Sequence, residues 1–369
     1  MFNFLTKLTL FFKTPAIIIV AGSGRQSAAE AVFSVLKQHY KIKKLDEFSS
    51  PLDLKSVIAN EILIIESEVR NLRPFEVLIK KSAMPILVLT HFGEIPVEKD
   101  FFAADIEQVK QVAKLAELLP AHGRLILNFD DETVREIKKK SRAHPLTFGF
   151  QDGADIRASD CHITKTIEIG TNFKINYQGK IIPIWLNRLF GKAEVYSALA
   201  ASCAGMAQGL NLVEVSQALK LYQGIQGRMQ LIKGVKGSWI LDDSESASVF
   251  SMTEALEILK TIETEGRKIA VLGDVLGIGK YAIEAHEALG ERAGNVCDLL
   301  FTVGSRAKFI AQGAKSRGIA ESKIFQFDES QSAAKALQNE IKQGDLVLVD
   351  GSKEMKMGKI IEEIKDFSK

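Results

Sequence analysis

The sequence predicts an α/β protein with parallel sheets, because short buried strands alternate with amphipathic helices along most of the chain. In the first part, the apolar runs Ala16–Val20, Ile62–Ile65 and Pro85–Thr90 have the length of buried strands and end in polar or glycine residues. In the last part, Lys268–Leu272 and Asp298–Val303 repeat the pattern with helices between them. We therefore expect a central parallel-sheet domain followed by a smaller, doubly wound domain of Rossmann-like type.

Chain length and composition indicate an ordinary globular protein of two or three domains. Of its 369 residues, 46% are apolar and 25% are charged, which is enough to bury a sizeable core. The formal net charge of +2 gives no electrostatic reason to expect nucleic acid as a partner. Cys161, Cys203 and Cys297 lie far apart, so neither disulfides nor a zinc site are expected, and we predict a reducing, cytoplasmic compartment.

Residues 1–15 read as an apolar lead-in segment. The run MFNFLTKLTLFFK is interrupted by Lys7 and Lys13 and followed by Pro15, so it is shorter than the roughly 20 residues that a membrane-spanning helix needs. We expect neither a transmembrane segment nor a signal peptide here. An amphipathic helix that packs on the domain or on a partner is the expected structure, and loose contact with a membrane interface is the alternative.

A glycine-rich turn follows the first strand. The sequence AGSGRQS leads into a helix expected over Gln26–His39, and strand, glycine turn and helix together are the layout of a phosphate-binding loop. Such a loop uses a lysine for the phosphates and then a hydroxyl for magnesium, but Arg25 and Gln26 stand in those places. Arginine keeps the positive charge of lysine but spreads it over a planar guanidinium group. Glutamine is a poor magnesium ligand beside serine or threonine. The nucleotide-binding candidates here are Gly22, Ser23, Gly24, Arg25, Gln26 and Ser27.

A second group of candidates lies between residues 227 and 280. A short strand, Ser238–Leu241, ends in Asp242 and Asp243, and Ser251 is expected to cap a helix over Met252–Thr261. The next strand follows that helix. This order places the two acids at the carboxyl edge of a parallel sheet, where ligands of open α/β sheets bind.

The same block, GR followed by a strand, DDSESASVFSM, a helix and VLGDVLGIG, resembles the third domain of the Mur ligases. Within that family it is most similar to the ligases that add D-alanyl-D-alanine to UDP-MurNAc-tripeptide in peptidoglycan synthesis. The resemblance implies ATP and magnesium as cofactors, with Arg228 reaching the nucleotide phosphates and Asp243 holding the ribose. It also implies that Glu66 helps to hold the metal and that Asn128 contacts nucleotide. A strand followed by Asn-x-Asp-Asp is also typical of a turn, so a structural role for Asn128 is equally expected.

The resemblance covers nearly the whole chain from Ala16. It implies a P-loop-like ATPase domain over residues 16–225, completed by a small antiparallel sheet between residues 146 and 185, and a C-terminal Mur ligase domain over residues 226–369. The family's separate N-terminal domain, which recognises the UDP part of the substrate, has no room in this sequence. The expected architecture is therefore two Mur-type domains after the lead-in segment.

Several residues depart from the family pattern besides those of the loop. Pro96 stands in place of a histidine that ligates metal, and the neighbouring His91 is expected to be an ordinary loop residue. A carbamylated lysine that bridges the metal is replaced by Val112, and a His-Asn pair that binds the base is replaced by Ala193-Glu194. Asp350, in DGSK, stands where a lysine is expected.

Two functions remain open on these grounds. The first is a Mur-type ligase by descent whose catalytic site is degraded, acting as a nucleotide- or partner-binding protein beside a competent ligase. The second is a divergent but active ATP-dependent ligase that forms amide bonds with Arg25, Glu66, Arg228 and Asp243. A Rossmann-like dehydrogenase is disfavoured, because AGSGRQS lacks the third glycine of GxGxxG.

Overall fold

The computed structural model describes residues 15–46, 60–92, 106–164, 169–245 and 247–367. The chain forms two compact units. The first holds the described residues up to His162 together with Thr171–Asn187 and Lys192–Gln223. The second holds Arg188–Gly191 and everything described after Gln223, with a short piece around residue 169. The predicted lead-in segment, residues 1–15, lies outside the described residues except for Pro15.

The first unit is built on a nine-stranded sheet with the order β2-β3-β1-β4-β5-β6-β7-β8-β9. Neighbours from β2 to β7 run parallel. The strands are β1 (Ala16–Ala21), β2 (Ile42–Asp46), β3 (Ile62–Glu66), β4 (Pro85–Leu89), β5 (Arg124–Asn128), β6 (His144–Gly149), β7 (Ile156–Thr164), β8 (Gly170–Tyr177) and β9 (Lys180–Asn187). The central strands are continuous runs of Ile, Leu and Val because helices cover both faces of the sheet.

The strands in the region expected to form a small antiparallel sheet, residues 146–185, belong to the nine-stranded sheet. Strands β7, β8 and β9 are hydrogen-bonded onto β6 and extend the same sheet. Only two residues separate β8 from β9, and Gln178 and Gly179 both have positive φ values of 47° and 75°, as a tight hairpin requires. Their attachment to β6 was not predicted, because alternation along the strands predicts a half-buried sheet but not which neighbour it joins.

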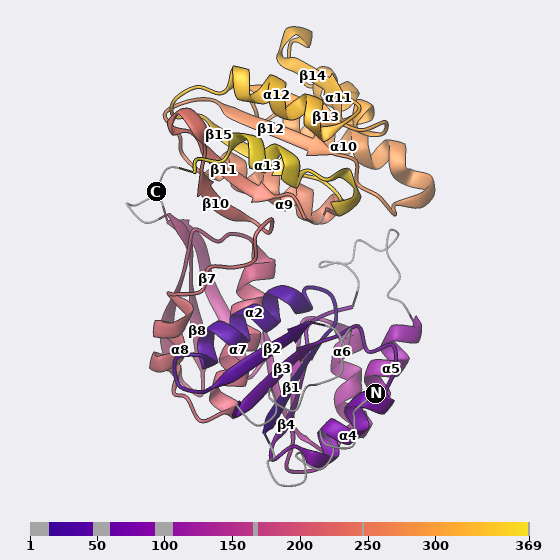
Figure 1. Cartoon of the computed structure of the whole chain (residues 1–369), viewed down its shortest axis with the longest axis vertical. Helices are drawn as coiled ribbons and strands as arrows, with labels where there is room; N and C mark the ends of the chain where they lie inside the picture. The colour runs from indigo at the N-terminus through magenta and orange to yellow at the C-terminus, as the bar shows by residue number, and fades with distance from the viewer. Residues whose placement is uncertain (1–14, 47–59, 93–105, 165–168, 246, 368–369) are drawn as a thin grey trace. The chain divides into compact units, whose positions relative to one another are not determined.

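Helices pack on both faces of this sheet. Figure 1 shows α4, α5 and α6 on one side of β1, β3 and β4, with α2 and α7 on the other. The first face forms a core in which Phe75, Val112 and Val134 meet alternate residues of the strands. The helices of this unit are α2 (Arg25–Leu36), α4 (Arg73–Lys81), α5 (Ile106–Glu117), α6 (Glu132–Ile137), α7 (Lys192–Ala207) and α8 (Leu212–Leu219), with a 3₁₀ turn at Lys138–Lys140.

The second unit has a six-stranded sheet with the order β10-β11-β15-β12-β13-β14. Only the edge pair β10–β11 is antiparallel; the other neighbours run parallel. The strands are β10 (Gln230–Lys233), β11 (Trp239–Asp243), β12 (Lys268–Gly273), β13 (Leu299–Val303), β14 (Ile324–Phe327) and β15 (Leu346–Asp350). This is the doubly wound α/β arrangement that the alternating pattern predicts, with one added edge strand.

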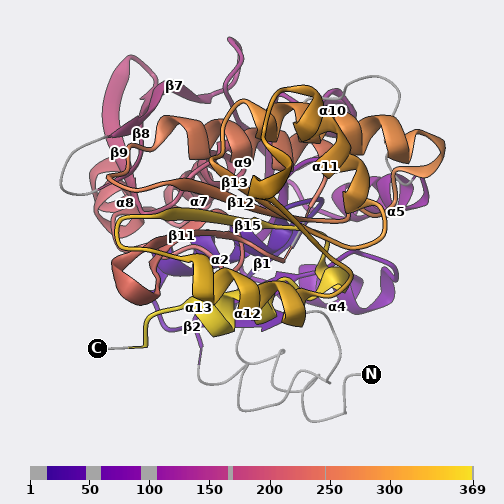
Figure 2. The same ribbon diagram turned by 90° about the horizontal axis from the view of Figure 1, so that it is seen from above.

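Five helices sandwich the second sheet. Figure 2 shows α9, α10 and α11 on one face of β11, β12, β13 and β15, with α12 and α13 on the other. Each layer has its own apolar core, built from alternate residues of the same strands. The helices are α9 (Val249–Thr261), α10 (Ala282–Gly294), α11 (Ala307–Ser316), α12 (Ser330–Glu340) and α13 (Gly358–Ile364), with 3₁₀ turns at Val235–Gly237, Gly279–Tyr281, Glu321–Lys323 and Lys353–Met355.

The start of α9 differs from the predicted one. Ser248, not Ser251, is the capping residue, and the side chains of Ser248 and Ser251 accept hydrogen bonds from each other's backbone N–H groups. Ser251 therefore takes the position usually held by Glu or Gln in a capping box, which is why the sequence pattern was misleading. The sequence also gave no prediction for α4, β10 or α13.

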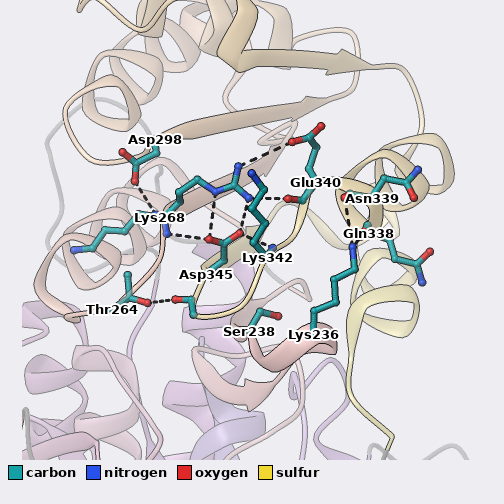
Figure 3. Close-up of polar contacts among 12 residues, drawn as sticks. Lys236, Ser238, Thr264, Lys268, Asp298, Gln338, Asn339, Glu340, Lys342 and Asp345 are labelled. Carbon is teal, nitrogen blue, oxygen red and sulfur yellow. Dashed lines mark hydrogen bonds and ion pairs between the residues drawn. The ribbon is translucent and has the colours of Figure 1, made fainter.

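The amino-terminal edge of the second sheet is tied together by polar contacts (Figure 3). Asp345, which is 1% exposed, accepts hydrogen bonds from the guanidinium Nη2 of Arg267 at 2.7 Å and from the backbone N–H groups of Arg267 and Lys342, each at 2.9 Å. Arg267 also donates to the carbonyl oxygen of Glu340 at 2.6 Å. These bonds join the loop before β12 to the loop before β15, so this edge is fixed by charge-assisted contacts.

Candidate functional site

The glycine-rich turn after β1 has two glycines in left-handed backbone conformations, and at the first of them a side chain would also clash. Gly22 has φ of 103°, and a Cβ atom there would lie 2.5 Å from Thr90 Oγ1 and 2.7 Å from the carbonyl oxygen of His91. Gly24, with φ of 73°, precedes the first turn of α2. Side-chain-bearing residues rarely adopt either conformation. The turn is therefore shaped as the sequence predicts for a loop that approaches a ligand closely.

The end of β4 holds this turn in place. The backbone N–H of Ser23 donates to the carbonyl oxygen of His91 at 2.7 Å, and the Thr90 hydroxyl donates to the carbonyl oxygens of Ala21 and Ser23 at 3.1 and 2.5 Å. Burial lowers the pKa of His91 to about 4, so its imidazole is neutral at physiological pH. Its Nδ1 atom is buried and has no hydrogen-bond partner among the described residues.

Arg25, the residue in the place of the phosphate-binding lysine, is already engaged by two carboxylates. Its Nε lies 3.2 Å from Glu66 Oε1, and its Nη2 donates to Glu68 Oε1 at 3.0 Å. The side chains of Arg25 and Glu66 are only 21% and 9% exposed, so water screens this pair weakly. Glu68 also pairs with Arg70 at 2.5 Å. The charge expected to face phosphate is therefore matched by charges of the protein itself.

The residues around the loop do not fit a magnesium ion. Glu66, the predicted metal ligand, is paired with Arg25. Gln26 replaces the ligating hydroxyl, and Val112, in the place of the bridging lysine, is fully buried in the apolar core. Pro96 lies outside the described residues. Within the described part of the chain, no group of three or more His, Cys, Asp or Glu side chains is arranged to hold a metal ion. Magnesium at a nucleotide site is usually held by one or two carboxylates together with phosphate oxygens and water, and the carboxylate available here, Glu66, is engaged by Arg25.

Asn128 and the two acids after it make contacts within the first unit. The side-chain oxygen of Asn128 accepts from the backbone N–H of Asp130 at 3.0 Å, while its Nδ2 is buried with no partner among the described residues. Asp130 accepts from Phe150 N and from the Tyr196 hydroxyl at 2.6 and 2.7 Å. Asp131 caps α6 and accepts from Phe92 N at 2.7 Å. The side-chain amide of Asn128 therefore keeps a donor that no described residue accepts.

At the position of the family's His-Asn pair, Glu194 makes a buried hydrogen bond within the first unit. Glu194, on α7, is 2% exposed and accepts a hydrogen bond from the Tyr222 hydroxyl at 2.8 Å. That hydroxyl also lies 3.2 Å from the carbonyl oxygen of Ser27, in the first turn of α2. Ser27 is itself buried. Through Tyr222, Glu194 is therefore linked to the first turn of α2, the helix that follows the glycine turn.

In the second unit, Arg228 and Asp243, the two residues expected to contact nucleotide, lie close enough for the charge of Arg228 to act on Asp243. Asp243 Oδ1 accepts from the backbone N–H of Met229 at 3.1 Å, and the side chain is only 5% exposed. Burial raises the pKa of Asp243 well above its usual range; the hydrogen bond from Met229 and the charge of Arg228 act in the opposite direction. The loop candidates, Glu66 and Asn128 belong to the first unit.

The structure adds a partner that the sequence analysis did not connect to Asp243. Asp350 pairs in register with it across β11 and β15 and is 0% exposed. Both of its carboxylate oxygens are buried without a hydrogen-bond partner among the described residues. Burial, and then the charge of Asp243, raise the pKa of Asp350. Two adjacent buried acids of this kind titrate as a pair, and their mutual repulsion and burial both favour the protonated form.

Two further residues were missed or undervalued from sequence. Glu68, the second carboxylate on Arg25, follows Glu66 by two residues at the end of β3, and that spacing was the available signal. His286, in α10, is 0% exposed and accepts from Val275 N at 3.1 Å, while its Nδ1 lies 2.5 Å from the carbonyl oxygen of Ala282. These contacts give His286 a structural role, because they tie α10 to the loop after β12.

Two protein-family models match the chain in succession. The Mur ligase middle domain matches residues 55–205, and the glutamate ligase domain of the Mur ligases matches residues 227–353. UDP-N-acetylmuramoyl-tripeptide–D-alanyl-D-alanine ligase of Bacillus subtilis is 24% identical over 358 residues, which is 95% of this chain and 76% of the relative. UDP-N-acetylmuramate–L-alanine ligase of Alkaliphilus metalliredigens is 32% identical over 145 residues, 39% of this chain and 31% of the relative.

Solved structures of MurF ligases share the fold. The MurF ligase from Thermotoga maritima in complex with ADP superposes with a TM-score of 0.71 at 20% identity, covering 97% of this chain and 81% of that one. MurF from Acinetobacter baumannii gives a TM-score of 0.78 at 18% identity, covering 97% and 79%. At these identities the likeness establishes the fold alone. Since both domain models match in order along the sequence, the protein belongs to the Mur ligase family and is related to MurF.

Proposed function

We propose that this protein is a Mur-ligase-family chain in which the ATP-dependent ligation reaction is impaired, and that it acts as a nucleotide- or partner-binding pseudoenzyme. The observation that carries this proposal is the pairing of Arg25 with Glu66 and Glu68 at 3.2 and 3.0 Å. Phosphoryl transfer depends on positioned cations that neutralise the developing charge. A loop whose only positive side chain is matched by two acids offers a triphosphate little attraction.

The surrounding residues support the same proposal. Gln26 and Val112 supply neither a hydroxyl nor an amine for a metal, and Glu194 braces Tyr222 in the place of the base-binding pair. Losing one member of a cooperative catalytic site can lower the rate by several orders of magnitude. Several simultaneous losses favour a binding role over turnover. The scaffold remains intact, so binding to nucleotide or to a protein partner stays available.

The proposed setting is the cytoplasmic synthesis of peptidoglycan precursors, beside a competent Mur ligase or another cell-wall enzyme. Support comes from the relatives, whose names describe ligases that act on UDP-N-acetylmuramoyl substrates. No described helix is long and apolar enough to cross a membrane. The net charge of only +2 by itself gives no electrostatic reason to propose nucleic acid or a membrane surface as a partner.

A divergent but active ATP-dependent ligase is the second candidate, and one specific observation favours it. The glycine turn keeps its demanding backbone conformation, and the first turn of α2 has no side-chain cap to occupy its free N–H groups. Such a helix terminus still attracts an anion. A relative with this fold holds ADP. In this alternative, Arg25 would leave Glu66 and Glu68 when phosphate arrives.

The deciding experiment combines calorimetry with a turnover assay. Mg-ATP is titrated into the full chain, and phosphate release is then followed with UDP-MurNAc-tripeptide and D-alanyl-D-alanine present. The D-alanyl-D-alanine-adding ligase of Escherichia coli, one of the relatives, serves as the positive control. We expect weak or undetectable Mg-ATP binding and no substrate-dependent phosphate release. Micromolar binding together with release that requires both substrates would establish the second candidate instead.

A further inference from the structure

The small net charge of the chain hides an uneven distribution of charge within the first unit. At the carboxyl ends of its strands, Glu66 and Glu68 pair with Arg25, and Glu68 also pairs with Arg70. The opposite end of the sheet, where the strands begin, carries exposed basic side chains and few acids. Charge that cancels over the whole molecule can still produce a strong local potential on one face.

The topology of the sheet brings these basic residues together. A helix that connects two parallel strands runs back across the sheet, so its last turn lies at the edge where the next strand begins. In this unit α4, α5 and α6 do so side by side on one face, and α2 does so on the other (Figure 1). The residues that we call the basic edge are Lys37 at the end of α2, Lys80 and Lys81 at the end of α4, Lys114 at the end of α5, and Lys138, Lys139, Lys140 and Arg142 before β6.

The basic edge faces solvent and is largely unpaired. All of its members except Lys81 are exposed, and the one ion pair among the described residues joins Lys139 to Glu136 at 2.7 Å. The exposed acids Glu61 and Glu117 also lie here, so basic side chains outnumber acidic ones among the described residues. From β2 to β6 the edge covers five strand spacings, roughly 24 Å at about 4.8 Å each. The helix dipole favours a basic residue at each helix end, but it does not account for three consecutive lysines after the six-residue α6.

An apolar segment joins the chain at the same edge. The lead-in segment ends at Pro15, whose carbonyl oxygen accepts a hydrogen bond from Ser82 Oγ at 3.1 Å. Ser82 directly follows α4, and its Oγ accepts from the backbone N–H of Ile17 at 3.0 Å. Residues 2–13, FNFLTKLTLFFK, contain four phenylalanines, three leucines and two lysines, but no acid. A strongly apolar sequence is thus tethered beside the basic edge.

The described surface around Pro15 has no apolar patch to receive this segment. The exposed large apolar side chains of the first unit are Ile181, Val213 and Leu221. They belong to β9, to α8 and to the residues just after α8, and β9 lies at the far side of the sheet from β2 and β3. Among the described residues of β1, β3, β4 and α4, no large apolar side chain is exposed. The elements that flank the segment therefore offer it charge rather than apolar surface.

We propose that the first unit binds the surface of an anionic lipid bilayer, with the basic edge against the headgroups and the apolar residues of the lead-in segment inserted at the interface. Stable attachment to a membrane surface requires two signals, such as an apolar anchor and a polybasic patch, because either one alone binds only marginally. Both are present here at one edge of one unit. The attachment uses no residue of the glycine-rich loop, so it holds whether or not the protein binds nucleotide.

The test is sedimentation of the full chain with lipid vesicles. One set contains phosphatidylcholine alone, and in the other part of it is replaced by phosphatidylglycerol. We expect binding to the anionic vesicles only, and loss of that binding as sodium chloride is raised, because salt screens the headgroup charge. The triple variant Lys138→Gln, Lys139→Gln, Lys140→Gln should bind at least about tenfold more weakly. Phe11→Ser with Phe12→Ser should weaken binding by at least about tenfold as well, because the apolar anchor is reduced.

A matched control separates the basic edge from general electrostatics. Lys308→Gln with Lys323→Gln and Lys335→Gln removes the same charge from exposed positions of the second unit and should leave vesicle binding unchanged. An equal loss in the two triple variants would overturn the proposal.

Two further outcomes would also contradict membrane binding. In the first, the phenylalanine variant unfolds at a lower temperature but binds vesicles like the native chain, which would mean that the segment packs on the protein itself. In the second, a duplex oligonucleotide binds the native chain as tightly as the anionic vesicles do and the phenylalanine substitutions weaken neither interaction. The basic edge would then be a surface for nucleic acid.

Discussion

Asp243 and Asp350 stand side by side as register partners at the carboxyl ends of β11 and β15, and both side chains are almost completely buried. Like charges in adjacent buried positions cannot both ionise without a large cost, because neither water nor a cation compensates them fully. The charge of Arg228 offsets part of the repulsion at Asp243, but burial outweighs it. This pair makes the stability of the second unit depend on pH in a defined direction.

Asp350→Asn should stabilise the protein, and the gain should grow with pH. The pKa of Asp350 is raised in the folded state, so its stability contribution is fully present below the unfolded value of about 4 and is lost as pH rises toward the folded value. We expect the free energy of unfolding of Asp350→Asn to exceed that of the native chain by about 1–3 kcal/mol at pH 8 and by almost nothing at pH 4. Urea unfolding at both pH values measures it. Glu354→Gln, an exposed change nearby, should show no such trend; an equal gain at pH 4 and pH 8 would refute the prediction.

Asp345→Asn should destabilise the protein, with the opposite pH dependence. Burial alone would raise the pKa of Asp345, but the hydrogen bonds from Arg267 and Lys342 outweigh it and lower the pKa. A lowered pKa contributes stability above the unfolded value of about 4, and this is lost as pH falls through the folded value. We expect a loss of about 2–4 kcal/mol at pH 7 that shrinks toward pH 3. Urea unfolding of the native chain and of Asp345→Asn at pH 7 measures this loss. Equal unfolding midpoints would show that the contacts of Asp345 with Arg267 and Lys342 do not stabilise the protein.

Glu66→Gln combined with Glu68→Gln should release Arg25 for phosphate. With both counter-charges removed, the guanidinium can make bidentate contacts to a phosphate group. Calorimetric titration with tripolyphosphate should show binding at least about tenfold tighter than in the native chain. Adding Arg25→Met to the double variant should abolish the gain. If the native and double variants bind alike, Arg25 is not the residue that the carboxylates restrain.

Gly22→Ala should disrupt the glycine turn. The added Cβ would lie 2.5 Å from Thr90 Oγ1 and 2.7 Å from a backbone oxygen, and φ is 103°. We expect a loss of more than about 2 kcal/mol in unfolding free energy, because both sterics and backbone conformation oppose the change. Gly179→Ala, in the β8–β9 turn, also has positive φ, but its Cβ would meet nothing within 4 Å, so its loss should be clearly smaller. Equal losses in Gly22→Ala and Gly179→Ala would mean that the positive φ value alone, and not the steric clash at Gly22, determines the loss of stability.

Much of the fold follows from local sequence patterns. The apolar runs predict the parallel strands, because only strands covered on both faces tolerate such continuous hydrophobicity. The join between β6 and β7 could not be predicted in this way, since it depends on pairing between distant segments. The start of α9 was misplaced because Ser251 and Ser248 are both good capping residues, and packing chooses between them.

The sequence motifs predict which residues belong to the candidate site, but they do not predict how these residues pair. The glycine turn follows from its motif, and the positive φ values of Gly22 and Gly24 agree with it. The pairing of Arg25 with Glu66 and Glu68 could not be read from the sequence, because the resemblance assigns Glu66 to a metal instead. Asp350 was noticed only as a departure from the family pattern, since register across two strands more than a hundred residues apart is invisible to a local pattern.

The two ends of the second sheet are held by different groups of residues. Arg267 and Asp345 clamp the end at which the strands begin, while the residues open to change sit where the strands finish. Substitutions at the carboxyl ends of the strands therefore do not remove the contacts that hold their amino ends. In particular, changes at the carboxyl ends of β11 and β15 leave the hydrogen bonds between the loops before β12 and β15 in place.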